Sequence, residues 1–254
     1  MQFDIKGRLK KETDIFKGIT MSFQWRSHES AAASANALAD AVAAALQAAL
    51  DQKGNAVLAV SGGRSPIAFF EALSQKDLDW ANIGLTLVDE RIVPTGHADS
   101  NTGLVREYLL QNKAAAASWI PMVEADAAEA DLVPEQAVQT ALKYFRQPDA
   151  LVLGMGGDGH TASLFPQAPQ LEQGLDLANE VPLLHTTPVT APHERISMTL
   201  AAILKTPAVF LAIQGEEKKK VFDEAAKGFN KTFPISYIVN PQQEKVNCHV
   251  HYAN

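Results

Sequence analysis

The sequence predicts an α/β fold, in which a mainly parallel sheet is covered by helices on both faces in one Rossmann-like, three-layer domain. Strand-like apolar runs alternate with helical segments along most of the 254 residues. Glycine-rich or polar loops follow three of these strands directly. No repeat, low-complexity block or linker divides the chain, so we expect a single domain over residues 21–254.

The amino-terminal part supplies the clearest helix. Ser30 is suited to cap a helix over the alanine-rich Ala31 to Leu50, and Gly54 is suited to end it. The run Ala56–Val60 then has the short, continuously apolar character of a buried strand. A helix begins again after Pro66, a residue favoured in the first helical turn.

The same alternation continues to the end of the chain. The remaining predicted strands are Ile83–Val88, Ser118–Val123, Ala150–Leu153, Ala208–Ile213 and Ile235–Val239, and the remaining predicted helices are Ala68–Leu73, Asn101–Gln111, Pro134–Phe145 and Glu216–Lys227. We interpret Cys248 to His251 as a polar tail rather than a metal site. Ligands of parallel sheets bind at the carboxyl ends of the strands, so the loops after the strands should share one crevice.

Composition limits the classes of function. Hydrophobic residues form 46% and charged residues 20% of the chain, which is typical of a globular protein. The net charge of -7 argues against binding to nucleic acid or to an anionic membrane. One cysteine and no apolar run of membrane-spanning length favour a cytoplasmic protein. Residues 1–20 have no apolar signal region, and we treat them as an extension without a role in function.

The segment Gly154 to Gly159 matches the G-x-G-x-x-G pattern of dinucleotide sites. That pattern needs a long helix after its last glycine, and Pro166 stops any helix after little more than one turn. The loop also lacks an acidic residue at the end of a following strand. The sequence therefore argues against NAD.

The same loop carries groups suited to acid–base chemistry. Asp158 and His160 pair a carboxylate with the side chain that titrates near neutral pH. Gly156, Gly157 and Gly159 allow close approach of a ligand and offer backbone N–H groups to an oxyanion. A capping aspartate and a surface histidine would be the default interpretation of either residue alone. Their combination after a buried strand favours a catalytic loop.

Two further loops complete the predicted crevice. Hydroxyl groups and glycine N–H groups between Ser61 and Pro66 could cradle a phosphate, although the segment fits a tight turn equally well in isolation. No P-loop lysine follows, so a nucleoside triphosphate is not expected. The triplet from Asp89 to Arg91 could be a solvated charge run, yet its arginine would reach the crevice and could bind phosphate.

At these positions the chain resembles the 6-phosphogluconolactonase family. The resemblance covers about Ser30 to Val239, and its motifs in order are SGGRSP, VDERIVP, SN, LGMGGDGHTASLFP, RISMTL and GEEKKK. It implies a lactonase domain similar in fold to glucosamine-6-phosphate deaminase. It also implies hydrolysis of 6-phospho-D-glucono-1,5-lactone to 6-phosphogluconate in the oxidative pentose phosphate pathway, with neither metal nor organic cofactor.

The resemblance also implies roles for individual residues. The catalytic candidates are His160 as general base with Asp158 beside it, together with Asp89 and Arg91 in the pocket. The candidates for holding the phosphate are Ser61, Gly62, Gly63, Arg64, Arg195 and Lys218. The expected partner is a phosphorylated sugar lactone, bound by a monomer or, as the alternative, a dimer.

Three alternatives stay open at this point. The first is a deaminase on the same fold, against which Arg91, Thr161 and Ser163 argue. The second is a non-catalytic sensor of sugar phosphates, which the pair of Asp158 and His160 disfavours. The third is a covalent serine mechanism, but the chain has no G-x-S-x-G motif, so we expect direct attack by water.

Overall fold

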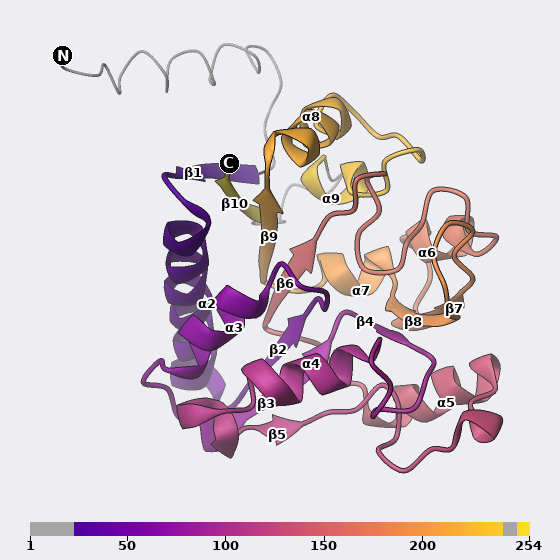
Figure 1. Ribbon diagram of the computed structural model, residues 1–254, viewed down its shortest axis with the longest axis horizontal. Coiled ribbons are helices and arrows are strands. Elements are labelled where there is room, and N and C mark those ends of the chain that lie inside the picture. The colour runs from indigo at the N-terminus through magenta and orange to yellow at the C-terminus, as the bar shows by residue number, and fades with distance from the viewer. Residues whose placement is uncertain (1–22, 241–247) are drawn as a thin grey trace.

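The computed structural model describes residues 23–240 and 248–254, and it contains a seven-stranded parallel sheet (Figure 1). The prediction for residues 1–20 lies outside the described residues. In spatial order the strands are β1 (Phe23–His28), β10 (Cys248–Ala253), β9 (Ala208–Gln214), β6 (Ala150–Gly154), β2 (Ala56–Val60), β3 (Ile83–Leu87) and β5 (Ser118–Trp119). Every neighbouring pair in this sheet is parallel, and the predicted fold class is confirmed.

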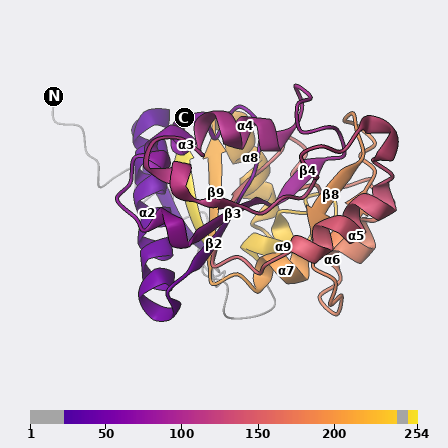
Figure 2. The ribbon, with the colours of Figure 1, turned by 90° about the horizontal axis from the view of Figure 1, so that it is seen from below.

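A second, antiparallel sheet lies beside the first. Its strands are β4 (Asp89–Arg91), β8 (Arg195–Met198) and β7 (Leu183–Thr186), in that order. Both views place this sheet at the opposite side of the molecule from the long helix α2 (Figure 2). Because β4 follows β3 almost directly, the second sheet continues from the carboxyl edge of the first.

Helices cover the sheet and connect its strands. The α-helices are α2 (Ala31–Lys53), α3 (Ile67–Ser74), α4 (Asn101–Tyr108), α5 (Pro134–Tyr144), α6 (Leu171–Leu175), α7 (Leu200–Leu204), α8 (Glu216–Ala225) and α9 (Ser236–Val239), and three short 3₁₀ turns span Trp80–Asn82, Asn112–Ala116 and Glu129–Asp131. The predicted limits of α2 lie close to the observed ones. Ser30 Oγ accepts a hydrogen bond from the N–H of Ala33, and Gly54 ends the helix with a φ of 75°.

Among the described residues, α2 alone has the length and apolar composition to cross a membrane. Its apolar face, with Leu38, Val42 and Leu46, is buried in the fold. Core packing therefore accounts for the apolar composition of this helix.

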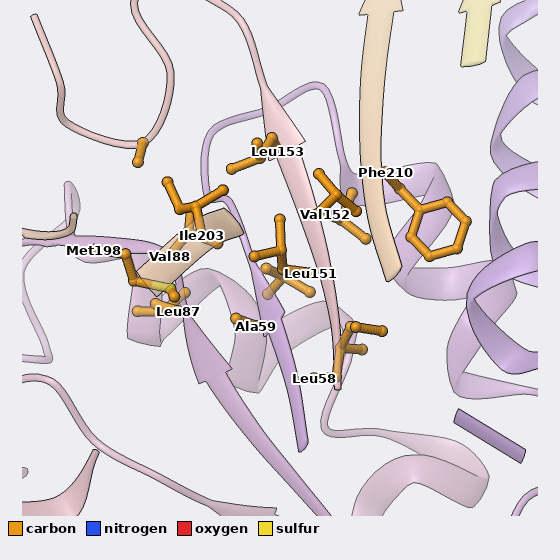
Figure 3. Packing of buried hydrophobic residues seen from close by; sticks show 14 of the residues in the cluster. Leu58, Ala59, Leu87, Val88, Leu151, Val152, Leu153, Met198, Ile203 and Phe210 are labelled. Atoms are coloured by element: carbon orange, nitrogen blue, oxygen red, sulfur yellow. The ribbon is translucent and has the colours of Figure 1, made fainter. Parts of the chain in front are cut away.

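The centre of the core lies between the sheet and its covering elements (Figure 3). Leu58 of β2 and Leu151 of β6 are fully buried, and Met198 and Ile203 extend the same core toward β8 and α7. These apolar strands need no alternation because a parallel sheet is buried on both faces. Rigid packing here fixes the loops at the carboxyl ends of the strands.

Some predicted elements were wrong. The run Ile235–Val239 is not a strand; its residues 236–239 form α9 after Pro234, and the N–H of Ile235 donates to the carbonyl of Gly159. Only residues 118–119 of the predicted strand Ser118–Val123 pair with β3. Residues Cys248–Ala253 are not a tail, because β10 lies between β1 and β9 inside the sheet. The strands β1, β4, β7 and β8 are not among the predicted elements.

Candidate active site

A cavity of about 340 Å³ opens at the carboxyl ends of β2, β6 and β9. It brings together most of the predicted site residues, although these come from distant parts of the chain. The predicted residues that line it are Ser61, Gly62, Gly63, Asp89, Arg91, Gly156, His160, Arg195 and Lys218. Four predicted residues do not line it, namely Arg64, Asp158, Gly157 and Gly159. Arg64 is exposed on the surface.

The imidazole of His160 is held by the loop that follows β6. Its Nδ1 lies 2.5 Å from Oδ1 of Asp158, and the ring packs 4.2 Å from the ring of Phe165, centroid to centroid. Burial raises the pKa of Asp158, but the hydrogen bond and charge of His160 outweigh this effect, and the pKa lies below its ordinary value. An ionised Asp158 selects the tautomer with the proton on Nδ1, which leaves the lone pair of Nε2 for a substrate.

The glycines fix the shape of this loop. The N–H of Gly156 donates to the carbonyl of His160, and the N–H of Gly159 donates to the carbonyl of Gly156. Gly159 has a φ of 78°, and a Cβ there would lie 2.7 Å from the ring of Phe233. Two of the three predicted backbone donors are thus engaged in the turn. Gly157 is the remaining candidate among them.

Two arginines from the small sheet lie near each other at the cavity. Burial, followed by the charge of Arg91, lowers the pKa of Arg195. The guanidinium of Arg195 donates to the carbonyls of Pro192 and His193, and that of Arg91 donates to the carbonyl of Asp99. Nε of Arg91 is buried without a partner among the described residues. An anion between these side chains would relieve their repulsion and satisfy their donors.

Lys218 adds a third cation. It lies near the start of α8, after Gly215, and burial lowers the pKa of its amine. None of the described residues forms an ion pair with it. A half-buried ammonium group without a carboxylate partner is suited to an anionic ligand.

The loop after β2 approaches the cavity with its backbone. A Cβ added to Gly62 would lie 1.9 Å from Oδ1 of Asn101, so only glycine fits there without movement. Asn101 also donates to the carbonyl of Asp89, at 3.0 Å. Ser61 is engaged too, since its Oγ accepts from the N–H of Gly154. The loop is therefore hydrogen-bonded to the strand β6 and packs closely against the start of α4.

The sequence indicates no role for Asn101 or Glu90, and it argues against Ser163 as a nucleophile. Asp89 is buried, and its Oδ2 accepts a 2.6 Å hydrogen bond from Oγ of Ser163. Glu90 is fully buried, and its carboxylate accepts from the N–H groups of Asn101 and Thr102 at the start of α4. The pair Ser100-Asn101 was visible as a motif, but only the structure shows what it contacts.

Comparison with known proteins identifies the family. The family model described as glucosamine-6-phosphate isomerases/6-phosphogluconolactonase matches residues 29–248. The chain belongs to this family. Membership in the lactonase and isomerase family confirms the resemblance that the motifs indicated. The curated relatives also confirm the predicted enzyme class, a carboxylic ester hydrolase.

Individual relatives place the chain within the lactonase and isomerase family. It is 68% identical over 231 residues to the 6-phosphogluconolactonase of Neisseria meningitidis serogroup A, which covers 91% of this chain and 99% of that protein. The Pseudomonas aeruginosa 6-phosphogluconolactonase is 44% identical over 200 residues, 77% of this chain and 82% of that protein.

Solved structures agree with these relatives. The crystal structure of a putative 6-phosphogluconolactonase from Neisseria gonorrhoeae has a TM-score of 0.90 at 68% identity, covering 91% of this chain and all of that one. A monomeric glucosamine-6-phosphate deaminase, at 16% identity and a TM-score of 0.68, covers 91% of this chain and 97% of its own. This second likeness shows the shared fold alone.

Proposed function

We propose that the protein hydrolyses 6-phospho-D-glucono-1,5-lactone to 6-phosphogluconate. The observation that carries the proposal is the convergence on one cavity of three cations and of His160, which Asp158 holds from behind. The names of its relatives at 68% identity support the same substrate. We also propose that it acts in the cytoplasm, in the oxidative pentose phosphate pathway.

His160 is the proposed general base. Nε2 of His160 removes a proton from water as the water oxygen attacks C1 of the lactone, and Asp158 stabilises the imidazolium that results. The tetrahedral intermediate then collapses with cleavage of the bond between C1 and the ring oxygen. Nε2 returns its proton to that oxygen, so the histidine ends in its starting state. General-base catalysis of this kind contributes about 10²- to 10⁴-fold to the rate.

The cations divide between the reacting carbonyl and the phosphate. We propose that Arg195, Lys218 and the N–H groups from Ser61 to Gly63 bind the phosphate. Arg91, which lines the cavity, then stabilises the oxyanion at C1. Anchoring the remote phosphate positions C1 beside the water that His160 activates. We propose that the active form is a monomer, with a dimer as the alternative.

The test compares turnover of lactone generated in situ with its spontaneous hydrolysis, followed by NMR. We expect the wild type to exceed the spontaneous rate and His160→Ala to lose most of that excess. His185→Ala is the matched control, because Nε2 of His185 also lies 2.5 Å from a carboxylate, that of Glu194, but His185 does not line the cavity. Equal rates with and without the wild type would refute the function. Equal rates for wild type and His160→Ala would refute the role of the base.

The same preparation separates the alternatives. Release of ammonia from glucosamine 6-phosphate would favour the deaminase reaction of the family. Stabilisation by 6-phosphogluconate without any turnover of lactone would favour a sensor. A covalent adduct trapped on Ser61 or Ser163 would replace direct attack by water with a serine mechanism.

A further inference from the structure

Two loops outside the cavity meet at a cluster of two histidines and one aspartate. His97 and Asp99 lie in the loop between β4 and α4, and His193 lies in the loop that precedes β8. Antiparallel pairing of β4 with β8 brings the loops together. None of the three residues lines the cavity or belongs to a motif recognised in the sequence.

The ligand atoms of the cluster are close to the spacing that a metal ion requires. Oδ2 of Asp99 lies 2.9 Å from Nε2 of His193 and 3.9 Å from Nδ1 of His97, and all three atoms lie within 4.8 Å of one another. Bonds of about 2.0–2.2 Å to tetrahedral zinc place neighbouring ligand atoms about 3.3 Å apart. The two contacts of Asp99 therefore need to change by only about 0.4 and 0.6 Å, and the two histidine nitrogens need to approach each other by at most about 1.5 Å. Rotation of these partly exposed side chains allows such shifts.

The hydrogen bonds show that His97 already presents an unprotonated nitrogen, as a metal ligand must. The backbone N–H of Asp99 donates to Nδ1 of His97 at 3.1 Å, so Nδ1 carries a lone pair. A metal ion would replace that contact. At His193 the ion would replace the proton on Nε2. If the ring is charged, that proton is released to solvent; if the ring is neutral, the proton moves to Nδ1. An open fourth position would be filled by water.

We propose that His97, Asp99 and His193 bind a divalent transition metal ion, with zinc as the preferred ion. Imidazole nitrogen and carboxylate oxygen are common zinc ligands, and three protein ligands with one water form a complete tetrahedral set. This site is separate from the proposed lactonase reaction and does not depend on it.

The consequence of metal binding concerns the two cavity arginines. The loop of Asp99 provides the carbonyl that holds Arg91, and the loop of His193 provides a carbonyl that holds Arg195. An ion that links Asp99 to His193 therefore fixes both loops and both guanidinium groups. The bound ion would therefore cross-link the two loops and stabilise the wall of the cavity that the small sheet forms.

The test measures binding of zinc and of cobalt to the full chain, prepared free of metal. We expect one equivalent of zinc to bind and cobalt(II) to give the visible absorption of a tetrahedral centre. His97→Gln and His193→Gln should each weaken binding by at least about tenfold, because removal of a group that is only hydrogen-bonded to a metal ligand already causes that loss. His185→Gln is the matched control, because the His185–Glu194 pair offers only two ligands.

A second measurement separates loss of the site from loss of the fold. Zinc should raise the melting temperature of the wild type and of His185→Gln, but not that of His193→Gln. Without metal, the three proteins should melt at similar temperatures, since both side chains are partly exposed. Absence of zinc binding by the wild type, or equal binding by wild type and His193→Gln, would overturn the proposal.

Discussion

Gly156→Ala provides a direct test of the position of His160, because it changes the turn while His160 and Asp158 are both retained. A Cβ on Gly156 would lie 2.2 Å from Nδ1 of His160 and 2.6 Å from Oδ1 of Asp158. Ordinary contact begins near 3.4 Å, so the imidazole must move by about 1.2 Å (3.4 minus 2.2). A misplacement of about 1 Å can reduce a rate by about 10²-fold.

We therefore expect Gly156→Ala to lower kcat/KM for the lactone by about 100-fold, or about 2.7 kcal/mol of transition-state stabilisation. Gly157→Ala is the matched control, since its Cβ would meet no atom within 4 Å. The assay is lactone turnover at a fixed pH, with the melting temperature measured for each variant. Gly157→Ala should keep most of the activity.

A double variant shows whether the loss passes through His160. If Gly156→Ala acts by displacing the base, the variant that also carries His160→Ala should be no slower than His160→Ala alone. Full activity in a folded Gly156→Ala protein would refute the proposed position of the base. So would an equal loss in Gly157→Ala, because it would indicate a general disturbance of the loop.

Three further predictions concern the phosphate loop, the sheet and the start of α4. Gly62→Ala should raise KM by at least about tenfold with a smaller change in kcat, because its Cβ would push the side chain of Asn101 away from the phosphate loop. Steady-state kinetics measures this effect, and an unchanged KM would contradict it. Burial lowers the pKa of His251 from 6.5 to about 4, so the folded state binds fewer protons than the unfolded state between these pH values. The free energy of unfolding should therefore be highest above pH 6.5 and should fall by about 3 kcal/mol as the pH is lowered to 4. Urea titrations across this range should show a shallower fall for His251→Leu than for wild type. Glu90→Gln should lower the free energy of unfolding by at least about 2 kcal/mol, because the amide NH₂ group would face backbone N–H donors. A urea denaturation curve equal to that of the wild type would contradict this prediction.

Physical reasons separate the parts of the fold that the sequence predicts from those it does not. Long elements with one consistent pattern, such as α2, are readable because cap, periodicity and end signals agree. Short apolar runs are ambiguous, and Ile235–Val239 shows why: Pro234 and a hydrogen bond to Gly159 decide for a helical turn. The buried strand β10 was missed because its alternate histidines resemble a solvated segment.

The candidate site shows the same division. Side chains that carry chemistry, such as those of His160 and Arg195, are visible by residue type and motif. The contacts that position these side chains depend on residues distant in the sequence. No local pattern indicates that Ser163 donates to Asp89, or that the side chain of Asn101 fills the space beside Gly62. Backbone donors are also invisible in a sequence, because only the folded turn engages the N–H groups of two loop glycines.

The place of β10 between β1 and β9 has a consequence for the order of folding. Phe23 in the first described strand pairs with Cys248, so among the described strands β1 meets its neighbour only when the last part of the chain has been synthesised. Contacts so distant in sequence form slowly. Until β10 is in place, one edge of β9 lacks its neighbouring strand, and unpaired strand edges of this kind are sites where chains aggregate. A premature stop before residue 248 would leave that state permanent.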